Sequence, residues 1–562
     1  MITNQYVLAI LACTGGVLFG FDISSMSLIL GLDSWNNYFG NITEASGVRK
    51  VDASLQAGIT ASMPAGSALG AIVSGTLAER FGRKGAIFIG CCMWVIGSVL
   101  CCAAHNIPML IVGRVINGTC VGIASAQVPV YISEIARPTM RGRLVGMQQW
   151  AITWGICIFY FISYGCSFIV MGDNSGQWRT PWGLQMIPAL GLMALLPFMP
   201  ESPRYLASTG KWDDALHVLA AIHAKGDKND AVTLAEFKEI QANIEEESGS
   251  SWSELFSGRY LNRLHIVCFT QIWAQLTGMN VMMCVISRAS TLTESEIDMI
   301  FFCRYYITYI FQMAGYSGNI ALISSSIQYV INVLMTVPAL LFVDKWGRRP
   351  TLLIGSTLMA TFLFINAAIL ATKGHYYEPN TAVNSSDNDA VRWKIPDENH
   401  SAAVALIAMT YLFVASFAPT WGPVSWIYPP ELFPTRLRAK SNSLSTVSNW
   451  VMNCALAGFV PPGFKNIQWK VYVVFGIFCV AMTVHVFFCF PETKNLTLEE
   501  VEEMFAAGQP AWRTRGLTKE SKLHQIADKI ERGDNPDAAA KQALGYTANH
   551  SGDHASEDEK KN

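Results

Sequence analysis

Long apolar stretches recur along this 562-residue chain and constrain its fold more than any other feature. An α-helix needs about 20 apolar residues to cross a hydrocarbon core of about 30 Å. Hydrophobic residues make up 51% of the sequence and charged residues only 15%, with a mean hydropathy of +0.29. These values place the chain among membrane proteins, and we predict an all-α integral membrane fold.

Thirteen apolar pieces can be distinguished, and they correspond to twelve predicted transmembrane helices. Two pieces, 264–283 and 305–316, flank a charged stretch and together make one helix. The other predicted spans are 6–31, 56–78, 85–104, 109–132, 144–168, 182–199, 320–343, 351–372, 401–428, 441–462 and 470–490.

Short basic loops orient these helices. With twelve spans, the basic loops and both termini fall on one side, which the positive-inside rule identifies as the cytoplasm. The basic residues concerned are Arg80, Arg83, Lys84, Arg137, Arg141, Arg143, Lys345, Arg348, Arg349, Arg436, Arg438 and Lys440. The opposite loops carry glycosylation acceptor patterns at Asn41, Asn384 and Asn399.

The two halves of the sequence repeat the same motifs in the same order. The matched segments are "GTLAERFGRK" (75–84) with "LLFVDKWGRR" (340–349), "SEIARPTMRG" (133–142) with "PELFPTRLRA" (430–439), and "PESPRYL" (200–206) with "PETKNLTL" (491–498). Each motif follows a predicted helix at its cytoplasmic end. The repeat predicts a six-plus-six architecture with a transport site between the halves.

This division gives four regions. They are an N-terminal six-helix half at 1–199, a cytoplasmic helical linker at 200–262, a C-terminal six-helix half at 263–491 and a cytoplasmic tail at 492–562. The linker is polar and rich in Glu, and beyond residue 532 the composition of the tail favours disorder.

The charged residues of the repeated motifs are predicted to form ion pairs between helix ends. Such pairs would stabilise one access state of a transporter and break in the other. The residues are Glu79, Arg83, Glu134, Arg141, Asp344, Arg348, Glu431 and Arg438. The alternative is a set of solvated topology signals, and repetition in both halves favours the ion pairs.

Other functional classes find little support in the sequence. A net charge of −2 gives no indication of a nucleic-acid partner. The sequence contains no phosphate-binding loop, zinc-ligand spacing or nucleophile elbow, so we predict neither an enzyme nor a cofactor or metal. The histidines His105, His265 and His485 are isolated, and the fourteen cysteines lie mostly in apolar spans as small core residues.

The repeated motifs, with "GRVINGTCVG" (113–122) and "PVYISEIARPTMRG" (129–142), resemble the sugar porter family of the major facilitator superfamily. The resemblance covers roughly residues 6–500. Two longer segments, "ACTGGVLFGFDISSMS" and "WGPVSWIYPPELFPTRLRAKSNSLSTVSNW", are similar to the corresponding sequences of fungal high-affinity hexose–proton symporters. This resemblance implies the major facilitator fold, alternating access and a sugar site at mid-membrane depth.

The resemblance also implies which residues contact the sugar. Amides exchange hydrogen bonds with ring hydroxyls, and an aromatic face stacks on C–H surface. The implied residues are Gln149, Gln275, Asn280, Asn332, Trp426 and Asn449, with Tyr305 and Tyr306 at the outer mouth. The family usually has two adjacent glutamines where this chain has Ala274 and Gln275, which affects affinity or preference. A single amide in a membrane helix often only bonds a neighbouring helix, but several at family positions favour a sugar site.

Asp22 is a carboxylate deep in the first predicted helix, where it is costly unless paired or functional. Its expected partner is Arg114 on the fourth helix, and the resemblance implies that the pair couples proton binding to sugar entry. Burial favours a protonated carboxyl and a nearby Arg a charged one, so a changing distance would change protonation. The alternative is a purely structural ion pair.

An insert of 21 residues interrupts the seventh helix. Deleting 284–304 restores "TGMNVMMYYITYIF", in which the family spacing and the helix are both continuous. Five charges there would cost on the order of 2.5–3.5 kcal/mol each at a helix centre. The codons allowed for Met283–Val285 and Phe302–Arg304 include plausible intron borders, and those for Leu292–Thr293 a branch site. We interpret 284–304 as a translated, unspliced intron, the alternative being an evolved regulatory loop.

Taken together, the residues and the resemblance predict a proton-coupled monosaccharide transporter of the plasma membrane. A hexose is the expected substrate, with the proton and the lipid bilayer as partners and a monomer as the working unit. The alternatives are a sugar facilitator without proton coupling and a non-transporting sugar sensor that signals through its tail.

Overall fold

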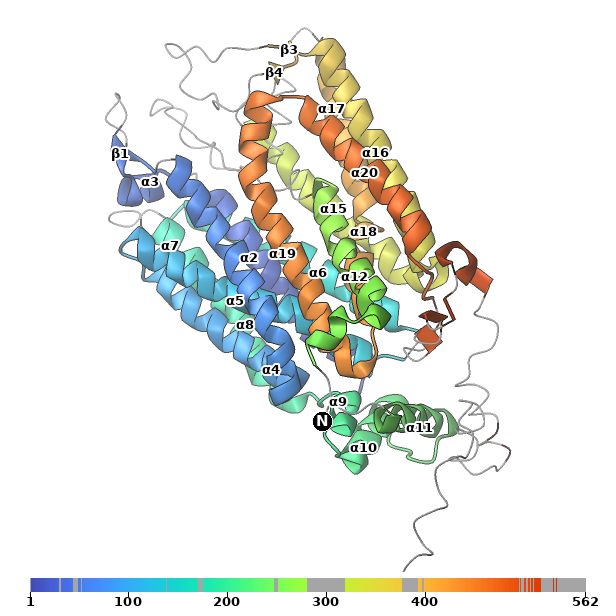
Figure 1. Cartoon of the computed structure of the whole chain (residues 1–562). Helices are drawn as coiled ribbons and strands as arrows, with labels where there is room; N and C mark the ends of the chain where they lie inside the picture. Colours follow the sequence, from blue (N-terminus) through green and yellow to red (C-terminus); the bar gives the residue numbers. More distant parts are fainter. Residues whose placement is uncertain are drawn as a thin grey trace, which may run out of the picture.

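The computed structural model describes most of the chain, and the regular structure of that part is almost all helix (Figure 1). The described residues are 2–29, 32–43, 49–51, 53–137, 139–169, 175–246, 251–279, 319–376, 393–396, 399–494, 496, 500–501, 504–505, 507–508, 510–516, 529 and 532. Asn280, Tyr305, Tyr306 and the insert 284–304 lie outside the described residues.

The first half of the chain forms one bundle of helices. Its main elements are α1 (Gln5–Ala12), α2 (Thr14–Ile29), α3 (Asp33–Phe39), α4 (Ala53–Cys102), α5 (Ile107–Ile135), α6 (Arg141–Ser167), α7 (Gly176–Leu184), α8 (Met186–Leu195) and the short η1 (Leu196–Phe198). The strands β1 (Ile42–Thr43) and β2 (Arg49–Lys50) pair antiparallel beside α3.

Three short helices follow the first bundle and lie beneath one end of the molecule (Figure 1). They are α9 (Pro203–Ser208), α10 (Trp212–His223) and α11 (Ala231–Glu246). We call the end of the molecule beside these three helices the linker end. Ser202 caps α9 because its hydroxyl accepts a hydrogen bond from the backbone N–H of Tyr205. Ala207, Leu219 and Phe237 form a small separate core that joins the three helices.

The second half forms the other bundle. Its elements are η2 (Ser253–Phe256), α12 (Gly258–Leu276), α15 (Asn319–Trp346), α16 (Arg348–Lys373), α17 (His400–Phe417), α18 (Trp421–Glu431), α19 (Thr435–Asn466) and α20 (Lys470–Cys489). The strands β3 (His375–Tyr376) and β4 (Trp393–Lys394) pair at the end opposite the linker, and η5 (Ala511–Gly516) follows α20 (Figure 1).

Nine helices among the described residues are long and apolar enough to cross a membrane. One of them, Gly58–Cys102, contains two predicted spans that meet at Gly82, and Ser401–Glu431 contains α17 and α18. The helices α12 and α19 occupy two further predicted spans. Isoleucines on outer faces remain exposed, such as Ile72 at 48% and Ile354 at 59%, which suits contact with lipid tails.

The chain reverses direction at two equivalent glycines of the repeated motifs. Gly82 has φ +79° and Gly347 has φ +89°, a backbone region that residues with a Cβ rarely adopt. A Cβ at Gly82 would lie 2.5 Å from a carboxylate oxygen of Glu201, and one at Gly347 would lie 2.5 Å from Glu492. Both halves therefore build the same tight corner around the same type of acidic side chain.

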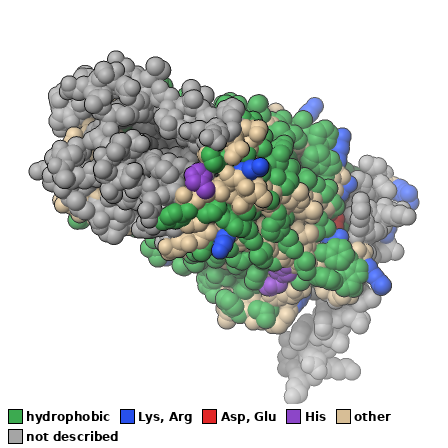
Figure 2. Space-filling view, turned by 90° about the horizontal axis from the view of Figure 1, so that it is seen from above, with side chains coloured by type: hydrophobic (Ala, Val, Ile, Leu, Met, Phe, Trp, Pro, Cys, Tyr) green, Lys and Arg blue, Asp and Glu red, His purple; other side chains and the backbone are tan. Residues whose placement is uncertain are grey.

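The two bundles pack along helices that face each other. The helix α6 of the first half contacts α15 and α18 of the second, while α19 contacts α4 and α5. One large apolar core extends across both bundles, and a smaller one lies under α3 and α7. Seen from the end that carries β3 and β4, hydrophobic side chains cover much of the described surface (Figure 2).

Candidate functional site

Two of the predicted sugar residues meet across the boundary between the halves. Trp426 on α18 donates its indole N–H to Oε1 of Gln149 on α6 over 3.0 Å. Both side chains are buried. The bond fixes the Gln149 carbonyl and leaves its NH₂ group as the hydrogen-bond donor of that amide.

A second pair of predicted residues lies within the second half. Gln275 on α12 donates its NH₂ group to Oδ1 of Asn449 on α19 over 2.7 Å. Asn453, one turn further along α19, donates to Oε1 of Gln275 over 3.4 Å. The Nδ2 atom of Asn449 is buried with no hydrogen-bond acceptor among the described residues. This small network presents an amide that a hydroxyl-rich ligand would satisfy.

Asn332 is also buried, on the separate helix α15. Sequence reasoning missed several neighbours of this region. Phe19 on α2 packs against Trp450 and Trp426, with ring centroids 4.9 Å and 6.1 Å apart. Gln148 is fully buried, and neither of its amide atoms has a partner among the described residues. The positions of Gln148 beside Gln149 and of Trp450 beside Asn449 were the available signal.

Asp22 on α2 lies 3.6 Å from Arg114 on α5, and both side chains are almost completely buried. Arg114 also donates to the backbone carbonyl of Ile59 over 3.2 Å and to the hydroxyl of Ser25 over 3.5 Å. Oδ2 of Asp22 has no hydrogen-bond partner within the described part of the chain. The pair is thus close but incompletely bonded, an arrangement in which the carboxylate can take up a proton.

At the linker end, the first half holds Glu134 in a buried ion pair. Arg83 donates from Nε and Nη2 to the two oxygens of Glu134, over 2.9 Å and 3.0 Å. Ser202 donates its hydroxyl to the same carboxylate over 2.5 Å. Such a two-point Arg–carboxylate contact is strong and directional.

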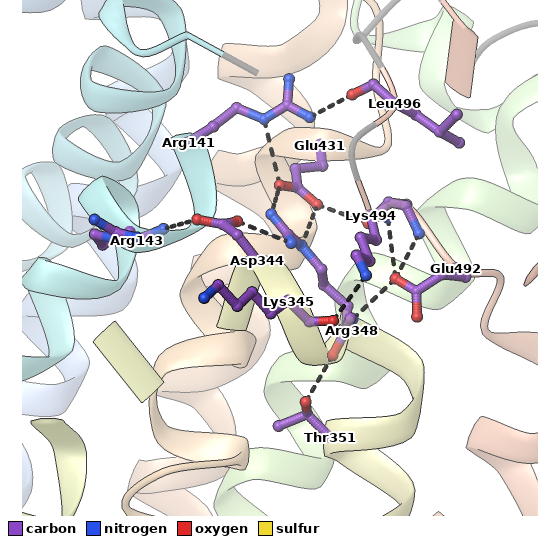
Figure 3. Close-up of polar contacts among 12 residues, drawn as sticks. Arg141, Arg143, Asp344, Lys345, Arg348, Thr351, Glu431, Glu492, Lys494 and Leu496 are labelled. Atoms are coloured by element: carbon purple, nitrogen blue, oxygen red, sulfur yellow. Dashed lines mark hydrogen bonds and ion pairs between the residues drawn. The ribbon is translucent and has the colours of Figure 1, made fainter. Parts of the chain in front are cut away.

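The second half repeats this arrangement around Glu431 (Figure 3). Arg348 donates to its two oxygens over 3.1 Å and 2.7 Å, and the hydroxyl of Thr493 donates over 2.7 Å. Tyrosines support both copies in the same way: Tyr131 donates to the carbonyl of Pro200, and Tyr428 to that of Pro491. The internal repeat seen in the sequence is therefore also a repeat of hydrogen bonds.

Four of the contacts that cross between the halves at the linker end involve a carboxylate. Arg438 reaches Glu134 at 3.4 Å and Arg141 reaches Glu431 at 3.3 Å, so each arginine binds the carboxylate of the opposite half. The two remaining contacts are Lys440 with Glu79 at 3.0 Å and the backbone N–H of Arg143 with Asp344 at 2.9 Å. These contacts hold the two bundles together at the linker end in this conformation. Figure 3 shows those of Arg141 with Glu431 and of Arg143 with Asp344.

The fold and these contacts define a class of protein before any comparison. Two helical bundles with a repeated motif, joined by ionic contacts at one end and with buried amides between them, form a membrane transporter of the major facilitator type. Among the described residues, no group of three His, Cys, Asp or Glu side chains could hold a metal ion.

The chain belongs to the sugar transporter family. The family described as "Sugar (and other) transporter" matches residues 8–293 and 297–505. The "MFS glucose transporter mfs1" of Aspergillus flavus is 43% identical over 98% of both chains. The "High-affinity glucose transporter" of Kluyveromyces lactis is 45% identical over 91% of this chain and 87% of its own.

Solved structures show the same fold. The proton:xylose symporter XylE bound to 6-bromo-6-deoxy-D-glucose matches with a TM-score of 0.71 and 26% identity, over 89% of this chain and 99% of that one. XylE from E. coli in a partially occluded inward open conformation gives a TM-score of 0.63 at 25% identity, over 88% and 99%. These matches confirm the predicted fold class of two helical halves and the sugar porter resemblance.

Proposed function

We propose that this protein carries a monosaccharide, with a hexose as the preferred substrate, into the cell together with a proton. The observation that carries the proposal is the buried Asp22–Arg114 pair. It lies in a protein whose two halves both contribute buried amides, and Trp426 of the second half bonds Gln149 of the first. The names of the relatives, which include two glucose transporters, support a hexose. The implied sugar contacts are Gln149, Gln275, Asn280, Asn332, Trp426 and Asn449, and Tyr305 and Tyr306 would gate the outer mouth.

Transport would proceed by alternating access. The crossed pairs Arg438–Glu134 and Arg141–Glu431 close the linker end, and they would separate when that end opens. The paired bonds within each half, such as Arg83–Glu134, would persist and keep each bundle rigid. The two bundles would thus move as bodies around a sugar held between them.

The proton would bind to the free oxygen of Asp22 from outside. Protonation removes the negative charge that attracts Arg114, which changes the preferred positions of α2 and α5. After reorientation the proton would leave to the inside, and Asp22 would pair with Arg114 again. Each cycle would thus move one proton with each sugar, without any covalent change.

The orientation follows from two features. The basic motif loops lie at the linker end, which would face the cytoplasm together with both termini. The acceptor asparagines Asn41 and Asn399 lie next to β1 and at the start of α17, at the opposite end (Figure 1). We propose the plasma membrane as the site of action, residues 1–199 and 263–491 as the two moving halves, and a monomer as the working unit.

Uptake of radiolabelled glucose into a host that lacks its own hexose transporters tests the proposal. Saturable uptake that is faster at pH 5 than at pH 7.5, and that acidic pH no longer accelerates in Asp22→Asn, is the expected result. Uptake that is independent of pH in the wild type would instead identify a facilitator. Absence of uptake, with the protein present at the membrane and a sugar-dependent transcriptional response, would identify a sensor.

A further inference from the structure

Two neutral groups bind the side chain of Arg114 in addition to Asp22. Its Nε–H donates to the backbone carbonyl of Ile59 on α4 over 3.2 Å, and its Nη1–H makes a longer bond of 3.5 Å to the hydroxyl of Ser25 on α2. Nη1 lies 3.6 Å from Oδ1 of Asp22, a separation longer than a good hydrogen bond. In this conformation the arginine is therefore bonded to neutral acceptors and attracted to the carboxylate mainly by charge.

Ser25 lies one turn after Asp22 on α2, and its side chain is fully buried. Its hydroxyl donates to the backbone carbonyl of Asp22 over 2.8 Å. A serine hydroxyl has one proton and two lone pairs, so this bond uses the proton and leaves the lone pairs for Arg114. The bond within α2 thus makes Ser25 an acceptor that faces the arginine.

The backbone carbonyl of Ile59 is open to side-chain donors. It accepts a bond from the hydroxyl of Ser62 over 2.6 Å as well as the one from Arg114. Pro64 follows in the same helix and has no N–H to donate to the turn before it. Side chains often bond the backbone near such a proline in a membrane helix. This carbonyl keeps its partial charge whatever the protonation of Asp22.

A buried arginine needs these acceptors when Asp22 is neutral. Arg114 is almost completely buried, and a guanidinium does not lose its proton in a protein. A buried charge without partners is costly. When Asp22 takes up a proton, it no longer compensates the charge of Arg114, whereas the Ser25 hydroxyl and the Ile59 carbonyl still accept hydrogen bonds. Proton uptake would then leave no unbonded cation between α2, α4 and α5.

We propose that Ser25 and the Ile59 carbonyl are the alternative acceptors that hold Arg114 while Asp22 is protonated. Ser25 is then a positioning residue for proton coupling, because it acts on the proton-binding carboxyl through Arg114. This role depends on the proposed function, in which Asp22 binds and releases a proton in each cycle. The experiments below therefore include one readout that does not require transport.

Melting temperatures of the purified protein provide that readout. Asp22→Asn imitates the neutral carboxyl, and Ser25→Ala removes one of the acceptors. We expect Ser25→Ala to lower the melting temperature about twice as much in the Asp22→Asn background as in the wild type, because neutral groups alone then hold Arg114. Ser67→Ala is the matched control: its buried hydroxyl bonds the Met63 carbonyl of its own helix, and its effect should be equal in both backgrounds. Equal effects of Ser25→Ala in the two backgrounds would overturn the proposal.

The pH dependence of glucose uptake is the second readout, and it also serves if the double variant does not fold. Without the Ser25 hydroxyl, a neutral Asp22 leaves Arg114 with fewer acceptors, so proton uptake becomes less favourable. We expect the pH of half-maximal uptake to fall by about half a unit in Ser25→Ala, which is about a threefold loss of proton affinity, and to recover in Ser25→Thr. An unchanged pH dependence in Ser25→Ala would contradict the proposal.

Other titratable groups do not account for such a shift. Among the described residues, the thiols of Cys101 on α4 and Cys120 on α5 also lie near Asp22, and a thiol is uncharged below about pH 7.5. The two readouts separate the two proposals. Uptake by the wild type that is independent of pH would refute proton coupling, whereas equal melting effects of Ser25→Ala in both backgrounds would refute the alternative acceptors.

Discussion

Asp22 and Arg114 lie 3.6 Å apart and are both buried, yet one oxygen of the Asp22 carboxylate has no hydrogen-bond partner among the described residues. A stable structural pair would be expected to satisfy both oxygens, since a buried charge that is incompletely bonded is costly. The arrangement instead suits a group that must change its charge during a cycle. The carboxylates of Glu134 and Glu431 differ from that of Asp22, because each of them is hydrogen-bonded on both oxygens.

The first prediction concerns Asp22→Asn. The amide cannot bind the transported proton, so accumulation of sugar against a gradient should fall about tenfold or more, whereas exchange of labelled for unlabelled sugar should continue. Uptake and counterflow in proteoliposomes measure the two. Asp213→Asn, which removes an exposed carboxylate of α10, is the control and should leave both unchanged.

The second prediction separates the two arginines that bind Glu431. Arg348 belongs to the same half as Glu431, and Arg141 to the other half. Removing one partner of a buried pair costs about 3–5 kcal/mol. We expect Arg348→Gln to lower the melting temperature strongly, because it destabilises one bundle. Arg141→Gln should mainly open the linker end.

Ser443→Cys reports that opening. The Ser443 hydroxyl lies 3.3 Å from that of Ser74 on the opposite half and is fully buried in this conformation. In a background without reactive cysteines, maleimide should label the introduced thiol faster in Arg141→Gln than in the wild-type sequence. Equal labelling rates would show that the Arg141–Glu431 pair does not control access.

Much of this linker-end network was predictable from the sequence, because charged residues that recur at equivalent positions of a repeated motif are expected to make equivalent contacts. The repeat indicated Glu134 and Glu431 as ion-pair partners of arginines. It did not indicate that Arg141 and Arg438 cross to the opposite half, since sequence order says nothing about which bundle a helix end faces. The contact of Glu79 with Lys440 was missed for the same reason.

The candidate sugar site was harder to predict from the residues alone. Its amides lie on four different helices, and only family resemblance placed Gln149, Gln275, Asn332 and Asn449 together. The hydrogen bond from Trp426 to Gln149 depends on the approach of α18 to α6, which no local pattern specifies. For the unpaired amide of Gln148, the only signal in the sequence was its position beside Gln149, because a single glutamine in an apolar helix has no periodicity of its own.

The third prediction concerns the bond between Trp426 and Gln149. A hydrogen bond of this kind contributes about 0.5–1.5 kcal/mol, so Trp426→Phe should raise the KM for sugar several-fold. In a double-mutant cycle with Gln149→Leu, the free-energy change calculated from the KM of the double variant should be smaller than the sum of the changes in the two single variants. Both substitutions remove the same bond. Fully additive effects would indicate that the bond does not position the amide for sugar.

The fourth prediction is a pH dependence in the linker. Burial lowers the pKa of His223, but the adjacent Glu236 carboxylate and hydrogen bonds outweigh burial, and the net pKa is raised above 6.5. The stabilisation from this group is therefore complete below pH 6.5 and is lost as the pH rises through the folded-state pKa. Burial raises the pKa of Glu236, but His223 outweighs it and the net pKa is lowered, so that contribution is lost only as the pH falls below 4.5.

The melting temperatures of the wild type and of His223→Gln should consequently differ most near pH 6 and converge toward pH 8.5. The control is His217→Gln, an exposed histidine on the same helix, which should follow the wild type throughout. A difference between His223→Gln and wild type that stays constant over this range would contradict the assignment of the charged pair.

The fifth prediction concerns the length of the native chain. If 284–304 is a translated intron, mature message lacks the corresponding codons, and the protein has 541 rather than 562 residues. Sequencing of the transcript across the codons for Met282 to Tyr306 decides this. If the codons persist in most message, the intron hypothesis is wrong and the charged segment is an evolved loop.

Proton movement driven by sugar is the most direct test of the proposed function. Proteoliposomes that enclose a pH-sensitive dye and hold the purified transporter are mixed with glucose outside, without an imposed proton gradient. Acidification of the interior by the wild type, with none in Asp22→Asn although that variant still exchanges glucose, is the predicted result. Glucose entry by the wild type without any change in internal pH would contradict proton coupling and identify a facilitator.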